Sequence, residues 1–447
     1  MTLSMTTPTP PAITFKTAML FWLKLGFISF GGPAGQISIM HQELVERRRW
    51  ISEGRFLHAL NYCMVLPGPE AQQLATYIGW LLHGTAGGIV AGVLFVLPSL
   101  FILILMSWIY VAFGDQPLIL GLFMGIKPAV TAIVLHAAWR IGSRALKNNW
   151  LWAVAAMSFI ASFVFAVPFP ALVLCAALIG SVGGQIAPAL FRSGGDHGKA
   201  MLNYGSALID DNTPRPHFTQ FSWFALLRTV GVGLMLWALP MLLLFNTLGW
   251  QHPFTQMSWF FTKAALLTFG GAYAVLPYVY QGAVNTYEWL TATQMIDGLA
   301  LGETTPGPLI MVVAFVGFVG AYGKEALGPE MLFVAGASAA TLVTWFTFLP
   351  SFIFILAGGP AIESSRNELK FTAPLTAITA TVVGVIVNLA MFFCYHVLWP
   401  SGLNGPFKWF SLLLALAAAL ALFRYKRSVI EVLFACAASG LLFSFIQ

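Results

Sequence analysis

The feature that most constrains this chain is an internal repeat built around helix-breaking residues. The run Phe30-Gly31-Gly32 recurs at residues 269–271, and the Pro-Gly-Pro triplet at residues 67–69 recurs at 306–308, both at a separation of 239 residues. An ungapped register of this length indicates an internal duplication. Repeats of this kind in a membrane chain are typical of transporters whose site lies between the two halves.

Composition places this repeat in a membrane. Hydrophobic residues make up 58% of the 447 residues and charged residues 9%, whereas a soluble domain carries about 25% charged residues. The predicted fold class is an all-α polytopic membrane protein with two inverted-topology repeats, broken re-entrant helices and about 13 hydrophobic segments. The net charge of +6 comes from basic residues at the ends of apolar runs. Membrane topology explains that placement, so we expect no nucleic-acid partner.

The apolar segments divide the chain into three parts. We expect an N-terminal repeat at 1–190, a polar linker with an extra transmembrane segment at 191–257, and a C-terminal repeat at 258–447. The apolar segments are expected at 14–29, 56–82, 87–112, 117–138, 150–166, 169–190, 221–249, 258–283, 291–320, 331–357, 371–397, 407–423 and 428–446. The segments 56–82 and 291–320 are each cut by a Pro-Gly-Pro triplet into pieces too short to span a bilayer. A re-entrant hairpin at 56–82 places the basic clusters at 47–55, 140–147 and 192–215 on one face of the membrane, whereas a full crossing does not, so we expect the hairpin.

Basic residues predict the orientation of each half, because Lys and Arg are enriched in cytoplasmic loops. In the first half they gather at 47–55, 140–147 and 192–215. In the second half they gather at 366–370 and 424–427. The corresponding loops of the first half, 113–117 and 166–170, contain no Lys or Arg. The opposite bias indicates that the halves lie upside down to one another, with the N-terminus inside the cell and the C-terminus outside. Lys324 fits this pattern poorly.

Two lysines lie inside apolar segments at equivalent repeat positions, Lys24 and Lys263. A lysine at the centre of a membrane helix costs roughly 2.5–3.5 kcal/mol on insertion scales. This chain carries one such lysine in each repeat. Lys24 and Gly31 are seven residues apart and share a helix face, so we expect the cation to point toward the Gly-Gly break. The alternative is that each side chain snorkels to the interface.

The helix breaks themselves predict an anion site. Non-helical backbone within the bilayer is tolerated where it is buried or lines a cavity. A helix that restarts there presents free N–H groups and partial positive charge, which bind anions. The implied cargo is a small anion, and a dianion fits; the alternative is that the triplets only kink the helices. The candidate substrate-binding residues are Lys24, Gly31, Gly32, Pro67, Gly68, Pro69, Gln72, Gln73, Lys263, Gly270, Gly271, Thr304, Thr305, Pro306, Gly307 and Pro308.

Three carboxylates lie near the breaks: Glu70, Glu303 and Asp297. Ionised, they repel an anion, so they either form ion pairs with cations or carry a coupling proton. No His, Cys and carboxylate set has metal-ligand spacing, and no nucleophile or phosphate-loop motif occurs. The sequence therefore predicts neither an enzyme nor a cofactor.

At these motifs the chain resembles a known family. The runs at 30–36, 41–51 and 66–74 resemble the chromate ion transporter (CHR) family, and the degenerate copies at 268–273 and 305–308 resemble the C-terminal half of its long-chain members. The resemblance covers essentially the whole chain. It implies two antiparallel homologous domains in a bacterial inner membrane that export chromate and confer chromate resistance, with sulfate as competitor.

The second half departs from the fuller motif: Ala272 stands in place of Pro33, and Leu309 in place of Glu70. We therefore expect the two halves to do different work. Two other functions remain open from the residues alone: an anion channel with the same cavity, and a proton-coupled carrier of another small anion such as sulfate, an organic anion or an amino acid. A homodimer is compatible with the sequence.

Overall fold

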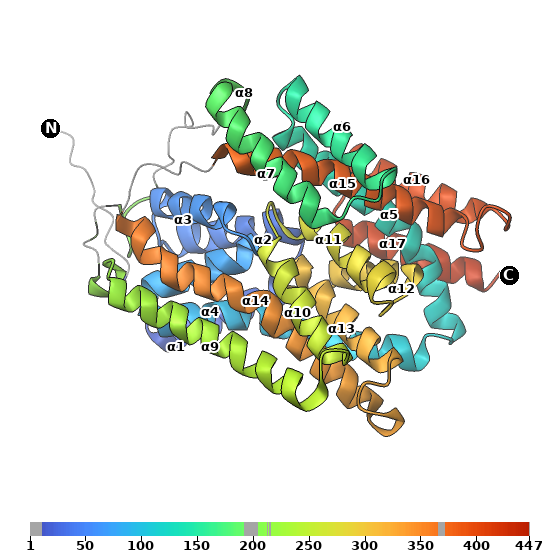
Figure 1. Ribbon diagram of the computed structural model, residues 1–447, viewed down its shortest axis with the longest axis horizontal. Helices are drawn as coiled ribbons and strands as arrows, with labels where there is room; N and C mark the ends of the chain where they lie inside the picture. The colour runs from blue at the N-terminus through green and yellow to red at the C-terminus, as the bar shows by residue number, and fades with distance from the viewer. Residues whose placement is uncertain (1–10, 192–203, 212, 214–215, 365–371, 447) are drawn as a thin grey trace.

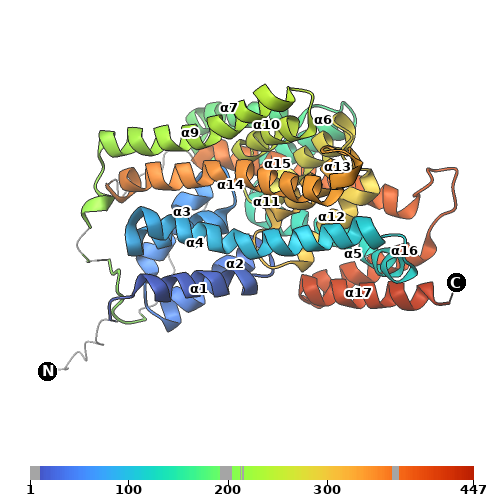
Figure 2. The same cartoon turned by 90° about the horizontal axis from the view of Figure 1, so that it is seen from below.

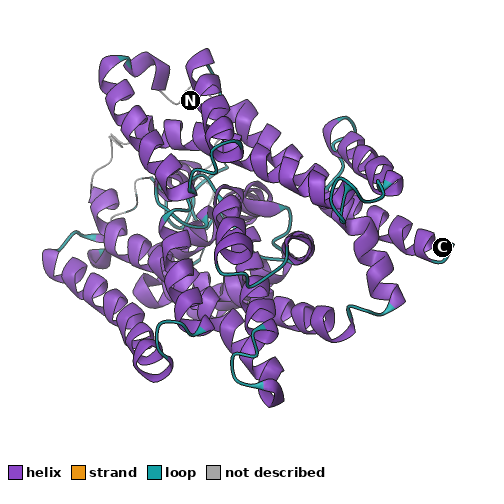
Figure 3. Ribbon diagram, turned by 45° about the vertical axis from the view of Figure 1, so that its right-hand side comes forward, coloured by secondary structure: helices purple, strands orange, loops and turns teal. Residues whose placement is uncertain are grey.

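The chain folds into helices joined by short loops (Figures 1 and 3). This computed structural model describes residues 11–191, 204–211, 213, 216–364 and 372–446. Within those residues the only strand-like pairing is one isolated bridge between Ile51 and Ile209. The all-helical expectation is therefore confirmed for the described part of the chain.

Six described helices are long and apolar enough to cross a membrane, as expected for a multi-pass membrane protein. They are α4 (Glu70–Phe113), α5 (Pro117–Ala145), α7 (Phe169–Ile186), α9 (Trp223–Leu248), α14 (Leu332–Ser364) and α15 (Thr372–Leu398). In Figure 2, α4, α9 and α14 run along the long axis of the molecule, with α1 toward one end and α17 toward the other.

The remaining helices are shorter. In the first half they are α1 (Phe15–Ile28), α2 (Gly32–His41), the π-helix η1 (Gln42–Arg47), α3 (Glu53–Val65), α6 (Asn149–Phe163) and α8 (Pro188–Phe191), followed by η2 (His217–Thr219). In the second half they are α10 (Pro253–Leu266), α11 (Ala272–Tyr280), the π-helix η3 (Gln281–Thr286), α12 (Ala292–Thr304), η4 (Leu309–Met311), α13 (Val312–Gly323), η5 (Pro329–Met331), α16 (Trp409–Phe423) and α17 (Val429–Ser444).

The repeat seen in the sequence is also a repeat of backbone geometry. The π-helices η1 and η3 occupy equivalent residues, and so do α3 and α12. After each π-helix one residue adopts a positive φ, Arg49 at 53° and Glu288 at 51°, although neither is glycine. Such residues are uncommon, so the same unusual turn at the same repeat position supports a common origin for the two halves.

Helix breaks lie where the sequence predicts them, because glycine and proline set local backbone geometry. The helix α1 ends before Gly31, which has a φ of 88°, and α10 ends before Gly270, at 79°. The segments expected at 56–82 and 291–320 are interrupted at the Pro-Gly-Pro triplets, between α3 and α4 and between α12 and η4.

The two halves differ at the junction after each broken element. In the first half His83 and Gly84 have non-helical backbone angles, so α4 consists of two helical stretches that meet at a kink, and the expected boundary between 82 and 87 is confirmed. In the second half the equivalent junction opens into the loop between α13 and η5. A Leu-Pro-Ser motif at residues 97–99 recurs at 349–351, an offset of 252 residues, whereas the triplets recur at an offset of 239. The second half therefore has 13 more residues between its triplet and this motif, and the extra residues allow the chain to leave the helix.

Part of the polar linker is ordered against the first repeat. The N–H groups of Leu208 and Ile209 donate to the carbonyls of Arg49 and Trp50, and Ser52 donates to Asp211 Oδ1 at 2.8 Å. The described part of the linker thus packs on the turn before α3. The basic residues Arg192, Lys199, Arg215, Arg366 and Lys370 lie outside the described residues.

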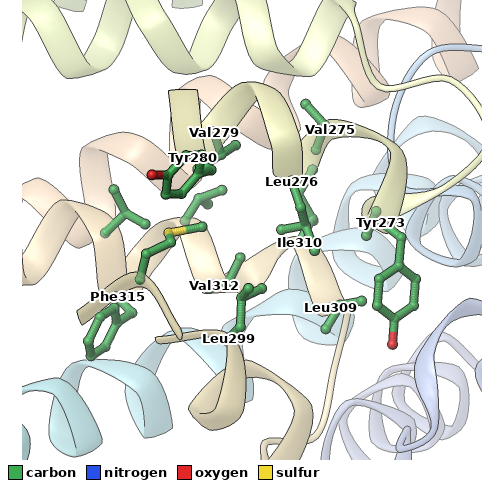
Figure 4. Packing of buried hydrophobic residues seen from close by; sticks show 14 of the residues in the cluster. Tyr273, Val275, Leu276, Val279, Tyr280, Leu299, Leu309, Ile310, Val312 and Phe315 are labelled. Atoms are coloured by element: carbon green, nitrogen blue, oxygen red, sulfur yellow. The ribbon is translucent and has the colours of Figure 1, made fainter. Parts of the chain in front are cut away.

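The two halves are not equally buried. All nine residues of α11 are buried, whereas in α2 only Gln36 and Met40 are. Figure 4 shows side chains of α11 such as Leu276 facing Ile310 and Leu309, which follow the second triplet. The second repeat therefore forms the centre of the largest hydrophobic core, and the break of the first repeat lies nearer the surface.

Candidate functional site

The two Pro-Gly-Pro triplets each bind the break of the other half. The N–H of Gly68 donates to the carbonyl of Thr268 at 2.7 Å, and the N–H of Gly307 donates to the carbonyl of Ser29 at 2.8 Å. Ser29 and Thr268 are equivalent repeat positions. Such a reciprocal pair, in which i contacts j and j contacts i, is the mark of a two-fold relationship. The four breaks therefore meet at one place in the molecule.

A repeated Leu-Pro-Ser motif packs on the two triplets. A Cβ atom at Gly68 would lie 2.3 Å from Ser351 Oγ, and one at Gly307 would lie 2.8 Å from Ser99 Cβ. Gly68 thus lies against Ser351 of α14, and Gly307 lies against Ser99 of α4. Neither position has room for a Cβ atom, so only glycine allows the backbone to approach these serines so closely.

Glutamine side chains complete the contacts around the triplets. Gln36 Nε2 donates to the carbonyls of Ser29 and Gly307. Gln73 Nε2 donates to the carbonyl of Pro67 at 2.8 Å. Gln72, in contrast, donates to Thr76 within its own helix.

Several buried polar atoms at the junction have no hydrogen-bond partner among the described residues. They are Ser29 Oγ, Gln36 Oε1, Gln73 Oε1 and Ser99 Oγ. Buried polar groups are nearly always bonded, and leaving one unsatisfied costs about 1–3 kcal/mol. Such a cluster of unsatisfied groups is expected where water or a polar ligand binds.

Space beside the Gly-Gly pairs lies open in the first half and is narrower in the second. A Cβ at Gly32 would meet nothing within 4 Å. One at Gly271 would lie 3.9 Å from Glu70 Oε1 and from Pro33, and one at Gly270 would lie 3.7 Å from Thr379 Oγ1 of α15. Glu70, the first residue of α4, therefore faces the Gly-Gly break of the other half.

The other two predicted carboxylates lie on α12. Glu303 is buried and accepts a hydrogen bond from Tyr273 Oη, in the first turn of α11 after the second Gly-Gly pair. Asp297 is buried in a separate group, 3.4 Å from Lys127 Nζ and bonded to Tyr110. Because Ser99 lies against Gly307, and Tyr110 lies about 16 Å further along α4, Asp297 is remote from the breaks.

The predicted lysines lie five residues before Ser29 and Thr268, and the predicted threonines directly precede the second triplet. Lys24 is exposed, on the same side of α1 as the exposed Leu20 and Phe27. Lys263 is partly exposed, with its Nζ 5.8 Å from the ring centroid of Trp259. The hydroxyls of Thr304 and Thr305 donate to backbone carbonyls within α12, and the prolines at 67, 69, 306 and 308 flank the two bonded glycines.

A buried ion pair that the sequence does not reveal joins α3 to the second half. Arg55 Nη1 lies 2.6 Å from Glu363 Oε2 on α14, and Tyr77 of α4 donates to the other carboxylate oxygen. Both charged side chains are buried. It resembles the Lys127–Asp297–Tyr110 group, because each joins a short helix after the π-helix, α3 or α12, to a long helix of the other half.

Sequence reasoning missed Gln36, Ser99, Ser351 and Tyr273 as parts of the site. A signal was present for the two serines, since Leu-Pro-Ser recurs in both halves. Gln36 lies three residues after Pro33, the last residue of the Gly-Gly-Pro run. Nothing in the local sequence marks Tyr273 as a partner of a residue thirty positions away.

Comparison with known proteins agrees with this architecture. The sequence model of the Chromate transporter family matches residues 16–181 and 255–441, one segment in each half. A chromate transport protein of Pseudomonas aeruginosa is 33% identical over 382 residues, which cover 84% of this chain and 80% of that protein. A chromate transport protein of Cupriavidus metallidurans is 28% identical over 380 residues, 85% of this chain and 82% of that protein.

A shorter relative matches only part of the chain. The uncharacterized transporter YwrA of Bacillus subtilis is 30% identical over 181 residues, 40% of this chain but 99% of its own length. A sequence about the length of one repeat thus occurs as a separate protein, which supports the duplication. No solved structure matches this chain. The two family-matched segments and the similarity to the full-length relatives show that this multi-pass membrane protein belongs to the chromate transporter family.

Proposed function

We propose that this protein is a carrier that exports chromate from the cytoplasm across the inner membrane of a bacterium, with the anion held where the four helix breaks meet. The observation that carries the proposal is the reciprocal pairing of each Pro-Gly-Pro triplet with the break of the other half. Such a junction between repeats is where transporters of this kind bind their substrates. The names of the full-length relatives support chromate as the substrate.

The two halves are proposed to be inverted repeats that enter the junction from opposite faces of the membrane. The helices α1 and α10 have 14 residues each, and α3 and α12 have 13, which gives lengths of about 20 Å. A hydrocarbon core is about 30 Å thick, so these helices end inside it. Re-entrant hairpins whose ends meet near the midplane fit this geometry.

Backbone and side-chain donors are proposed to share the binding of the anion. The N–H groups of Gly68 and Gly307 are bonded to carbonyls, so they stabilise the junction rather than bind the substrate directly. The first-turn N–H groups of α4 have no intrahelical acceptor, and those of α2 lie beside the open space at Gly32. Lys24 and Lys263 are proposed to add positive charge near the anion site.

The membrane potential favours export of such a substrate. One charge moved across 100 mV is worth about 2.3 kcal/mol, so a dianion leaving a cell that is negative inside gains about 4.6 kcal/mol. That corresponds to a concentration ratio of roughly a thousand. Export of a dianion therefore needs no second energy source, although coupling to a proton through Glu70 or Glu303 is compatible with the site.

Transport by everted membrane vesicles tests the proposal. We expect vesicles that contain the protein to accumulate chromate in a saturable manner and sulfate to compete, whereas amino acids do not compete. Lys24→Ala and Lys263→Ala are each expected to abolish accumulation, because the anion loses positive charge at the junction, while membrane insertion is unchanged. Uptake of labelled chromate, with the amount of inserted protein measured by immunoblot, gives the result.

Other outcomes of this assay contradict the proposal. Currents through single channels, or flux that does not saturate with chromate, would identify an anion channel. Competition by amino acids but not by sulfate would identify a carrier of organic anions. Full transport by both lysine variants would remove these residues from the site and favour their snorkelling to the interface.

Inverted topology makes a separate prediction at two equivalent repeat positions. In a variant without native cysteines, Arg48→Cys and Tyr287→Cys are expected to react with a membrane-impermeant maleimide from opposite faces of the membrane. The reason is that the halves insert upside down to one another. Labelling of intact cells compared with everted vesicles measures this. Reaction of both cysteines from one face contradicts the inverted arrangement.

A further inference from the structure

Three buried polar side chains from separate segments meet around Gly307, the central residue of the second triplet. The N–H of Gly307 donates to the carbonyl of Ser29 at 2.8 Å, and its own carbonyl accepts from Gln36 Nε2. On another side it lies against α4, since a Cβ at Gly307 would be 3.2 Å from Ser99 Oγ. One glycine thus brings together the loop between α1 and α2, the helix α2 and the helix α4.

Each of the three side chains has a polar atom that no described residue bonds. These atoms are Ser29 Oγ, Gln36 Oε1 and Ser99 Oγ, and each of the three residues is at most 1% exposed. Leaving buried polar atoms unsatisfied is costly, and it is uncommon in folded proteins. A single buried hydroxyl without a partner also occurs elsewhere, at Ser107, and indicates no ligand by itself. Three such atoms around one glycine indicate that a polar group binds there.

The first triplet has a different polar environment. The residues at the repeat positions equivalent to the three side chains are Thr268, Val275 and Ser351. The Thr268 hydroxyl donates to a carbonyl one turn earlier at 2.7 Å, and Ser351 Oγ accepts from Gln73 Nε2 at 3.4 Å. The unpartnered atoms described on the helix after this triplet are Gln72 Oε1 and Gln73 Oε1, which are acceptors and do not bind an anion. Unpartnered hydroxyl donors therefore lie at the second triplet, in agreement with the expectation that the halves do different work.

We infer that Ser29 and Ser99 are substrate-binding residues, whose hydroxyl groups donate to oxygens of the tetrahedral oxyanion beside Gly307. Open space lies at the adjoining Gly-Gly break, since a Cβ at Gly32 would meet nothing within 4 Å. Gln36 is a positioning residue, because its Nε2 donates to the carbonyls of both Ser29 and Gly307. Its Oε1 accepts from a water molecule beside the anion. This inference rests on the proposed function and names side-chain donors of that site.

Serine hydroxyls suit a fully ionised oxyanion, because such an anion offers only acceptors. A hydroxyl hydrogen rotates toward its acceptor, and hydrogen bonds to charged groups are about twice as strong as those between neutral groups. The competing explanation is that buried water alone bonds the three atoms and stabilises the junction. Loss of a hydroxyl would then change the Tm of the protein and leave its Kd for chromate unchanged, so the two explanations are separable.

Equilibrium dialysis of labelled chromate against the purified full-length protein tests the inference. Ser29→Ala and Ser99→Ala are each expected to raise the Kd for chromate by about 10- to 100-fold, the effect of losing a hydrogen bond to a charged group. Ser107→Ala is the matched control. Ser107 is as buried as Ser99, has no described partner and lies about 12 Å further along α4. Its replacement is expected to leave the Kd unchanged.

A second set of variants keeps the test decisive where an alanine variant fails to fold. Ser29→Cys and Ser99→Cys nearly preserve the side-chain volume but offer a weak S–H donor, so each is also expected to raise the Kd. The Tm of every variant is measured without ligand. An unchanged Kd together with a changed Tm at both serines would assign the hydroxyls to buried water and overturn the inference. A Kd raised equally by Ser107→Ala would overturn it too.

Labelled sulfate serves as a second probe, and its Kd is expected to rise in the same variants. Failure of the unmodified protein to bind or transport either oxyanion would refute the proposed function. Normal binding and transport by the unmodified protein, with an unchanged Kd in the Ser29 and Ser99 variants, would refute this inference alone.

Discussion

Replacing Gly68 by alanine is expected to abolish chromate export. At this position φ is +129°, a conformation that costs residues other than glycine about 1–3 kcal/mol. The new Cβ would also lie 2.3 Å from Ser351 Oγ and 2.6 Å from Gln73 Nε2. Relief of both contacts moves α14 away from the triplet and disturbs the junction of the breaks. Vesicle transport and the Tm of the purified protein measure the two consequences.

Two other glycines provide control substitutions, which separate the effect of backbone strain from the effect of the contact between the halves. Gly84 has a positive φ of 64° but open space around it, and Gly323 has open space without a positive φ. We expect Gly323→Ala to change neither transport nor Tm, and Gly84→Ala to lower the Tm with a smaller loss of transport. Adding Ser351→Ala to Gly68→Ala is expected to restore part of the transport. If Gly68→Ala changes transport and Tm by the same amounts as Gly84→Ala, the close contact between the halves at Gly68 is not required for transport.

Arg55→Ala is expected to destabilise the protein by about 3–5 kcal/mol, because it leaves the Glu363 carboxylate buried without its partner. The two groups are 2.6 Å apart, with relative side-chain exposures of 9% and 2%. Arg47→Ala is the matched control. Its guanidinium is 62% exposed and pairs with Glu43 in the preceding turn, and such surface pairs contribute about 0–1 kcal/mol. Thermal unfolding in detergent measures both variants.

An apolar replacement of the whole buried group distinguishes pairing from packing. The triple variant Arg55→Met, Glu363→Leu and Tyr77→Phe leaves no buried charge and no unsatisfied hydroxyl. Since similar replacements are often neutral or stabilising, its Tm is expected to recover toward that of the unmodified protein. A loss in Arg55→Ala no larger than in Arg47→Ala would show that water reaches Glu363 and that the pair does not hold α3 against α14.

Helix boundaries were largely predictable in this chain. The helix α9 was expected at 221–249 and spans Trp223–Leu248, and α16 was expected at 407–423 and spans Trp409–Phe423. The reason is local: a helix in lipid must satisfy its own backbone, and glycine or proline ends it. Proline does not always end a helix in this fold, since Pro98 lies inside α4, Pro128 inside α5 and Pro350 inside α14.

The partners of charged residues were not predictable. Arg55 directly precedes an apolar segment and was interpreted as a marker of a cytoplasmic loop, whereas Lys127 lies inside the segment expected at 117–138. In the fold, Arg55 reaches a carboxylate 308 positions away and Lys127 one 170 positions away. No periodicity within a helix identifies a partner on another helix, because partners depend on how the helices pack.

The sequence by itself determined that the chain is a duplicated, multi-pass helical protein, and where each copy breaks its helices, because glycine and proline act on their own backbone. The tertiary structure alone decided that each triplet binds the other half, that α11 is buried while α2 lies near the surface, and that Glu303 pairs with Tyr273. These properties depend on contacts between helices distant in sequence, and the burial of a helix is set by its neighbours rather than by its own residues.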